Sequence, residues 1–224
     1  MAQNPCDQEQ ALPVPARVRG HFEPGSSMLV MAGKTYTAPG QSAPPGRTVP
    51  QCASATLQAD RAWLRAGLVP GATAAQRSMA TRALLDLRLA VRPDGAVMAG
   101  WRSGWEYDWP RDSSWAAVAL AGTGHQDLAY QVLRFLARVQ GADGIWAARY
   151  LTDGSGPVHD GRPAELDADG WVPWAVWSWA ASQPSTSGRA FRQQLAVLWP
   201  MVTRAANAAA RSLTSDGLPG PAMD

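Results

Sequence analysis

The protein is a chain of 224 residues, of which 46% are hydrophobic, so it can bury a core as one domain or as one domain with a short appendage. Its formal charge of +2 comes from scattered arginines and a single lysine, and no basic run interleaved with aromatic residues indicates a nucleic-acid interface. No stretch approaches the roughly 18 to 20 apolar residues of a membrane span, and no secretory signal pattern is present. We therefore expect neither nucleic acid nor membrane as a partner, and the cytoplasm is the default location.

Residues 1–50 are rich in proline and glycine, which predicts an irregular leader with short strand-like pieces at 14–18 and 28–31. The pattern becomes helical after the leader. A first helix is expected over 54–66. A second helix is opened by a Thr-x-x-Gln capping box at Thr73 and Gln76 and is stopped by Pro93.

Four more helices follow. The third is expected over 112–121, and the fourth has one apolar face and a left-handed exit at Gly141. We expect Asp169 or Gly170 to cap the fifth helix, with Pro173 in its first turn. The sixth covers 189–213, and Pro200 should kink it.

Short and long connections alternate along these helices. Brief turns near 67–71, 122–124 and 183–188 predict three helical hairpins, and an Asp-Gly pair follows each hairpin, at 94–95, 143–144 and 216–217. We expect an all-α fold, with residues 51–224 as one incomplete helical domain. Because successive helices alternate in direction, the long loops should emerge at the same end of the helices and hold the functional residues.

The segment 105–115 carries the clearest functional pattern. Arg111 lies at a predicted helix start, where the helix dipole disfavours a cation, so a carboxylate should compensate its charge. Arg111 and Asp112 together offer donors and acceptors suited to two vicinal sugar hydroxyls, and Trp105, Tyr107 and Trp109 offer flat apolar faces. The plainer alternative makes Asp112 a simple N-cap, which explains neither Arg111 nor the aromatic residues.

A second polar cluster, residues 161–170, precedes the fifth helix and contains Arg162, Glu165, Asp167 and Asp169. A calcium loop is disfavoured because no closing glutamate stands twelve positions on, and we expect no metal or cofactor. A lone loop carboxylate such as Glu165 is more often solvated or paired than catalytic. We expect the tryptophans at 174 and 177 to pack in the core, and the histidines at 125 and 159 have no visible catalytic partners.

These motifs, in this order, resemble the glucoamylase-type glycoside hydrolases of family 15. The resemblance covers about residue 59 to the end, and rests on the run 105–115 together with Gly124-His125, 135–140, Asp143-Gly144, Arg149-Tyr150 and 161–170. It implies a catalytic (α/α)6 toroid of six hairpins, of which this chain supplies about three. It further implies that the substrate, an oligosaccharide or glucoside, is bound by Tyr107, Trp109, Arg111, Asp112, Arg162, Asp167 and Asp169.

Family members hydrolyse the glycosidic bond with inversion of configuration at the anomeric carbon. They use a general acid and a general base whose carboxyl groups are roughly 6.5 to 9.5 Å apart. Neither catalytic glutamate is recognisable in this sequence, so we expect no catalytic residue within the chain and no activity without a C-terminal half. The resemblance implies release of glucose from the non-reducing end of an α-glucoside. A trehalase of the same family and a non-catalytic sugar-binding fragment stay open as alternatives. Glu165 departs from the neutral polar residue expected in relatives, which leaves its role open.

Overall fold

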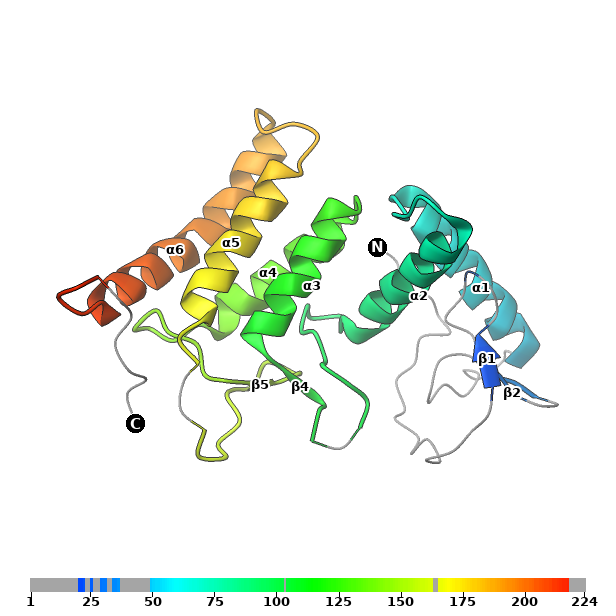
Figure 1. The fold of residues 1–224 in the computed structure, drawn as a ribbon, viewed down its shortest axis with the longest axis horizontal. Helices are drawn as coiled ribbons and strands as arrows, with labels where there is room; N and C mark the ends of the chain where they lie inside the picture. The colour runs from blue at the N-terminus through cyan, green and yellow to red at the C-terminus, as the bar shows by residue number, and fades with distance from the viewer. Residues whose placement is uncertain are drawn as a thin grey trace. The chain divides into compact units, whose positions relative to one another are not determined.

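A computed structural model of the protein describes residues 20–22, 25, 29–31, 34–36, 49–102, 104–162 and 165–217. The chain divides into two compact units, residues 1–89 and 90–224, and each is described by itself. Helices dominate both units, and the strands of the described part have two or three residues each (Figure 1). The predicted all-α class is therefore confirmed. No helix of this described part is long and apolar enough to cross a membrane.

The first unit combines a small sheet with a helical hairpin. Its antiparallel strands are paired in the order β1-β2-β3, with bounds Gly20–Phe22, Leu29–Met31 and Lys34–Tyr36. The strand predicted at 28–31 corresponds to β2, whereas the piece predicted at 14–18 lies outside the described residues. The hairpin consists of α1 (Val49–Ala66) and α2 (Ala74–Ala90).

The predicted capping box opens α2. The backbone N–H of Gln76 donates to Thr73 Oγ1 at 3.2 Å, and the Thr73 N–H donates to Gln76 Oε1 at 2.9 Å. The two helices are joined by Arg88 of α2, whose Nη1 donates to Asp60 of α1 at 2.7 Å. The same guanidinium lies over the Trp63 ring, 5.3 Å from its centroid. Local capping and this partly buried ion pair fix the hairpin.

The second unit contains two helical hairpins that pack on each other. The first joins α3 (Pro110–Gly122) to α4 (Gln126–Val139), and the second joins α5 (Ala168–Ala181) to α6 (Arg189–Ser212). α3 contacts both α4 and α5, and α6 contacts α4 and α5. Small residues on α3 and α5 permit this close approach, and Trp146 and Trp179 fill the core with fully buried rings.

Helices α3 and α5 both begin earlier than the sequence predicts. α3 starts at Pro110, because proline suits a first helical position, so Asp112 stands in the first turn and is not the N-cap. α5 starts at Ala168 with Asp167 as its N-cap residue, so neither Asp169 nor Gly170 caps it. Pro173 therefore lies past the first turn.

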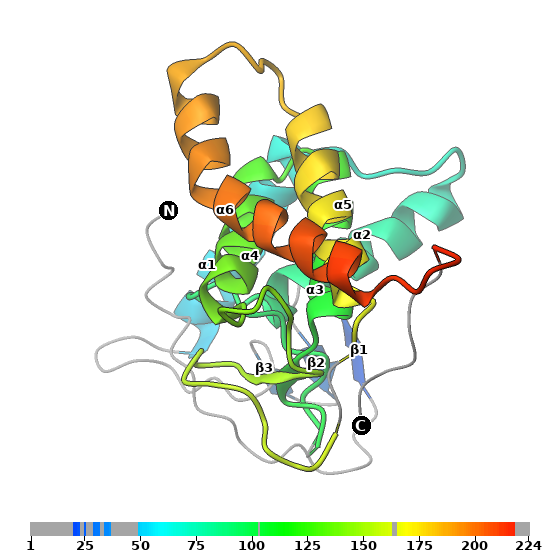
Figure 2. The ribbon, with the colours of Figure 1, turned by 90° about the vertical axis from the view of Figure 1, so that its left-hand side faces the viewer.

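Two expectations about side chains and glycines are also corrected. Trp177 is 66% exposed, because the buried face of α5 is formed by Ala168, Val172, Ala175, Val176 and Trp179. Gly141 does not have a positive φ, and α4 ends in extended backbone at Gln140. Pro200 lies inside α6, whose axis changes direction partway along its length (Figure 2).

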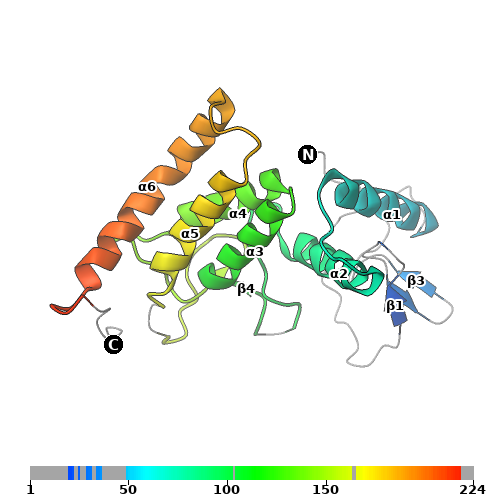
Figure 3. The ribbon, with the colours of Figure 1, turned by 45° about the horizontal axis from the view of Figure 1, so that its top comes forward.

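The long loops of the second unit, 91–109 and 140–167, emerge at the same end of α3 to α6 (Figures 1 and 3). They are joined there by a two-stranded antiparallel ribbon of β4 (Tyr107–Asp108) and β5 (Tyr150–Leu151). Each loop starts with the predicted Asp-Gly turn, in which Gly95 and Gly144 have φ of +98° and +94°. The predicted convergence of these loops is confirmed, and it places the two polar clusters at one end of the helices.

Candidate functional site

An aromatic group forms the first part of the candidate site. Trp109 is buried and its ring lies 5.8 Å from that of Trp105 and 6.0 Å from that of Tyr107, between centroids. Trp105 is 57% exposed, so it supplies the aromatic face that reaches solvent. Trp109, predicted to contact a ligand, supports this face from beneath. Tyr107 is half-buried and belongs to strand β4 of the ribbon.

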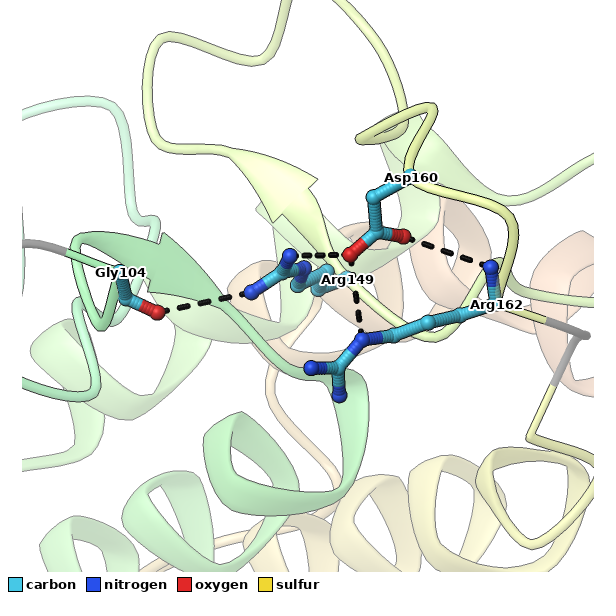
Figure 4. Close-up of polar contacts among 4 residues, drawn as sticks. All are labelled: Gly104, Arg149, Asp160 and Arg162. Carbon is cyan, nitrogen blue, oxygen red and sulfur yellow. Dashed lines mark hydrogen bonds and ion pairs between the residues drawn. The ribbon is translucent and has the colours of Figure 1, made fainter.

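Arg149 holds the aromatic group from the other loop. Its guanidinium carbon lies 4.4 Å from the centroid of the Tyr107 ring and 5.3 Å from that of the Trp109 ring. Arg149 also pairs with Asp160 and donates to the carbonyl oxygen of Gly104 at 3.5 Å (Figure 4). The side chain is only 11% exposed, so its contacts with the rings are shielded from water.

Arg162 shares the Asp160 carboxylate with Arg149 (Figure 4). Its Nε donates to Asp160 Oδ2 at 3.1 Å, and its backbone N–H donates to the other oxygen at 3.4 Å. The Arg162 side chain is 53% exposed, so most of its donors face solvent. The predicted binding residue Arg162 therefore lies beside the aromatic group, linked to it through one carboxylate.

Arg111 joins the two predicted clusters. Its Nη1 donates to Asp167 Oδ2 at 2.8 Å and lies 3.3 Å from Glu165 Oε2, although Asp167 follows it by 56 residues. The expectation that a carboxylate compensates this cation at the helix start is confirmed. Hydrogen bonding to Asp167 and its charge raise the pKa of Arg111. Within the described residues these contacts use Nη1 alone, which leaves Nη2 and Nε for a ligand.

Two further carboxylates, Asp112 and Asp169, flank this ion pair. Loss of solvation raises the pKa of Asp112, the charge of Asp167 adds to the rise, and Arg111 opposes it. Asp169 is buried, and burial together with the charges of Asp143 and Asp167 raises its pKa to about 6. One buried oxygen of Asp169 has no hydrogen-bond partner in the part of the chain that the structure describes. Arg111 thus lies in an acidic environment that can accept hydrogen bonds from hydroxyl groups.

Asp108 anchors the segment that carries Trp109 and Arg111. Its Oδ2 accepts hydrogen bonds from the backbone N–H of Val97 at 2.5 Å and from the Ser113 hydroxyl at 2.7 Å. The side chain is fully buried, and its Oδ1 has no hydrogen-bond partner among the described residues. Burial raises the pKa of Asp108 to about 7. One carboxyl group therefore ties the segment that follows the first Asp-Gly turn to the start of α3.

The predicted binding set lacks five residues of this site: Trp105 and Glu165, which the sequence analysis discusses, and Arg149, Asp160 and Asp108. Arg149 follows the second Asp-Gly turn and belongs to the motifs that carry the resemblance, so the sequence could have indicated that it lies in the site. Asp160 and Asp108 gave no such signal, because their importance depends on burial and on partners distant in sequence. In the described ranges, no group of histidine, cysteine, aspartate and glutamate side chains could hold a metal ion.

No family model matches the chain. The chain is 27% identical over 101 residues to a protein of Methanocaldococcus jannaschii named an uncharacterized glycosyl hydrolase. The match covers 44% of this chain and 16% of that protein, so the chain spans only a small part of its relative. The similarity supports a glycosidase-like chain and gives no finer assignment.

Proposed function

We propose that the loop end of the second unit is the substrate-binding part of a glucoamylase-like glycoside hydrolase. In this proposal Arg111, Asp112 and Asp167 bind hydroxyl groups of a terminal glucose unit, and Trp105 and Tyr107 cover the apolar side of the sugar ring. A C-terminal half would supply the general acid and the general base that perform inverting hydrolysis. Similarity to a named glycosyl hydrolase and the resemblance in motif order support this proposal.

The observation that carries the proposal is the contact between Arg111 and the pair Glu165 and Asp167. Two sequence clusters with separate functional patterns meet at one cation, and the exposed ring of Trp105 lies in the loop that leads to Arg111. Sugars are recognised by planar donors and acceptors beside aromatic faces, because a pyranose has hydroxyl edges and an apolar C–H face. An exposed ion pair contributes little to the free energy of unfolding by itself, so stability alone does not explain why polar and aromatic residues gather around this one.

The direct test is sugar binding by the full chain, measured by calorimetry and by saturation-transfer NMR with maltose, methyl α-glucoside and trehalose. We expect binding of α-glucosides without hydrolysis, and loss of binding in Arg111→Ala. Arg134→Ala is the matched control, because Arg134 is an exposed arginine on α4. Equal binding by Arg111→Ala and the control contradicts the proposal.

The choice of sugar separates the alternatives. Preference for trehalose over maltose favours a trehalase, and turnover of either sugar by this chain would refute the placement of the acid and base elsewhere. Binding of all three sugars without turnover, whatever polypeptide is added, favours a sugar-binding role. Addition of a C-terminal half tests the expected partner, which should restore hydrolysis.

A further inference from the structure

The first two Asp-Gly turns dock in the same way on the second helix of the following hairpin. A Cβ added to Gly95 would lie 2.2 Å from the carbonyl oxygen of Gln131 in α4. A Cβ added to Gly144 would lie 2.4 Å from the carbonyl oxygen of Arg204 in α6. Only glycine permits so close an approach, so each turn fits its helix backbone closely.

The register of the two contacts is identical. In both helices the contacted carbonyl stands eight residues before the last helical residue, and an apolar side chain four residues before the end packs on the glycine. An arginine one residue before the end then reaches the aspartate of the turn. Arg138 pairs with the Asp94 carboxylate at 2.7 Å, and Arg211 donates to the Asp143 carbonyl at 2.7 Å.

The third turn has the same local structure. The N–H of Gly217 donates to the carbonyl of Thr214 at 2.9 Å, as the glycine does in the other two turns, and Gly217 has a φ of +79°. In the described part of the chain, no atom lies within 4 Å of a Cβ built at Gly217. The turn 214–217 therefore has the local structure of the two turns that dock on a helix.

Helix α2 has an exposed face at the positions that correspond to those by which α4 and α6 contact their turns. Counted back from its end at Ala90, Arg82 takes the place of Gln131 and Arg204. The positions of α6 that are buried in this register, Met201, Ala205 and Ala208, correspond to Met79, Ala83 and Asp86 of α2, which are exposed. Met79 is 71% exposed, an unusual state for an apolar side chain at a helix–turn docking position.

We infer that two copies of this chain associate head to tail, with the turn 213–217 of one copy docked on α2 of the next. The contact repeats an interface that the chain already forms twice, and it covers the exposed side chains of Met79 and Ala83 on α2. It does not depend on the proposed sugar binding. Leu89 stands where α4 and α6 have an arginine, so the contact with Asp216 lacks the ion pair and rests mainly on packing.

Sedimentation velocity of the full chain over a wide concentration range tests this inference. We expect reversible association, and Gly217→Val should weaken it at least about fivefold, because the new side chain would meet the Arg82 carbonyl. Gly161→Val is the matched control, since Gly161 has a φ of +80° and no atom of the described residues lies within 4 Å of its Cβ position. Both substitutions carry the same backbone strain, so only docking separates them.

A gain-of-association variant provides the opposite test. Asp86→Ala combined with Leu89→Arg reproduces the Ala208 and Arg211 pair of α6, and it should tighten association about two- to fivefold through the added ion pair. Circular dichroism checks that each variant keeps its helix content. The inference is overturned if the chain is a monomer at every concentration or if the two glycine variants have equal effects. It is also overturned if Gly217→Val leaves the association unchanged. A monomeric chain would point to the expected C-terminal half as the occupant of this end.

Discussion

Arg149 and Arg162 bind the same carboxylate, that of Asp160, but differ in burial. Arg149 is 11% exposed and also lies against two aromatic rings, whereas Arg162 is 53% exposed. We expect Arg149→Ala to lower the free energy of unfolding by about 1–3 kcal/mol, since it removes a shielded ion pair and ring contacts. Arg162→Ala should cost less than about 1 kcal/mol. Urea denaturation of both variants measures the difference, and equal losses would show that burial does not separate their roles.

The buried Asp108 carboxyl predicts a pH dependence of stability. Its pKa is about 7 in the folded chain and 3.8 ordinarily, so between these pH values the folded state retains a proton that the unfolded state has lost. Its contribution is therefore present at low pH and is lost as the pH rises from 4 to 7, by up to about 1.4 kcal/mol per pH unit. Asp108→Asn should remove this slope, because an amide does not titrate between pH 4 and 7. The fold should be kept, since the amide oxygen still accepts hydrogen bonds from the Val97 N–H and the Ser113 hydroxyl.

Urea denaturation of the wild type and Asp108→Asn from pH 4 to pH 7 measures this effect. Asp169 acts with the same sign over a narrower range, since burial raises its pKa to about 6. The difference between wild type and variant therefore isolates Asp108, and Asp169→Asn is the control that should change only the lower part of the profile. Parallel pH profiles for wild type and Asp108→Asn would show that Asp108 is ionised in the folded chain.

The need of Arg111 for a counter-charge could be predicted from the sequence, because its place at a helix start is unfavourable for a cation. The identity of that counter-charge could not. Asp167 lies 56 residues away and reaches Arg111 only because two loops converge. The burial of Trp109 could not be predicted either, since aromatic residues occur both on ligand-binding surfaces and in cores.

At the scale of elements, local signals predicted the helices better than their ends. The Thr73 and Gln76 capping box was correct because both of its hydrogen bonds form within four residues. The start of α3 was placed too late because Asp112 is a good N-cap residue, whereas the helix starts at Pro110 without any side-chain cap. Trp177 was placed in the core because a three-residue spacing does not say which face of α5 has a neighbour.

The Asp-Gly turns give a prediction at this scale. Gly144→Ala should destabilise the chain by about 1–3 kcal/mol more than Gly217→Ala, because its methyl group would lie 2.4 Å from the Arg204 carbonyl oxygen. The comparison cancels backbone strain, since both glycines have positive φ. Thermal and urea unfolding at low protein concentration measure the difference. Equal destabilisation would mean that the turn moves away from α6 at little cost.

At the scale of the whole molecule, the alternation of short and long connections was enough to predict an all-α chain with its loops at one end of the second unit. The three-stranded sheet of the first unit was only partly foreseen, since the sequence indicated β2 and gave no signal for β1 and β3. Short strands depend on pairing with one another, and pairing is not visible in a local pattern. The predicted six-hairpin toroid stays a prediction, because the described residues supply three hairpins.

Sugar binding should act on two loops at once if the proposed site is correct. A glucoside held by Arg111 and Asp167 touches both 105–112 and 160–167, so amide hydrogen exchange should slow in both segments together on addition of maltose. Binding should also stabilise the chain, by about 2.7 kcal/mol when the sugar is at a hundred times its Kd. Arg111→Ala should abolish both effects, and Arg134→Ala should preserve them. Slower exchange in one segment alone would mean that the sugar is held by a single loop, and the contact between Arg111 and Asp167 would then serve the fold rather than the ligand.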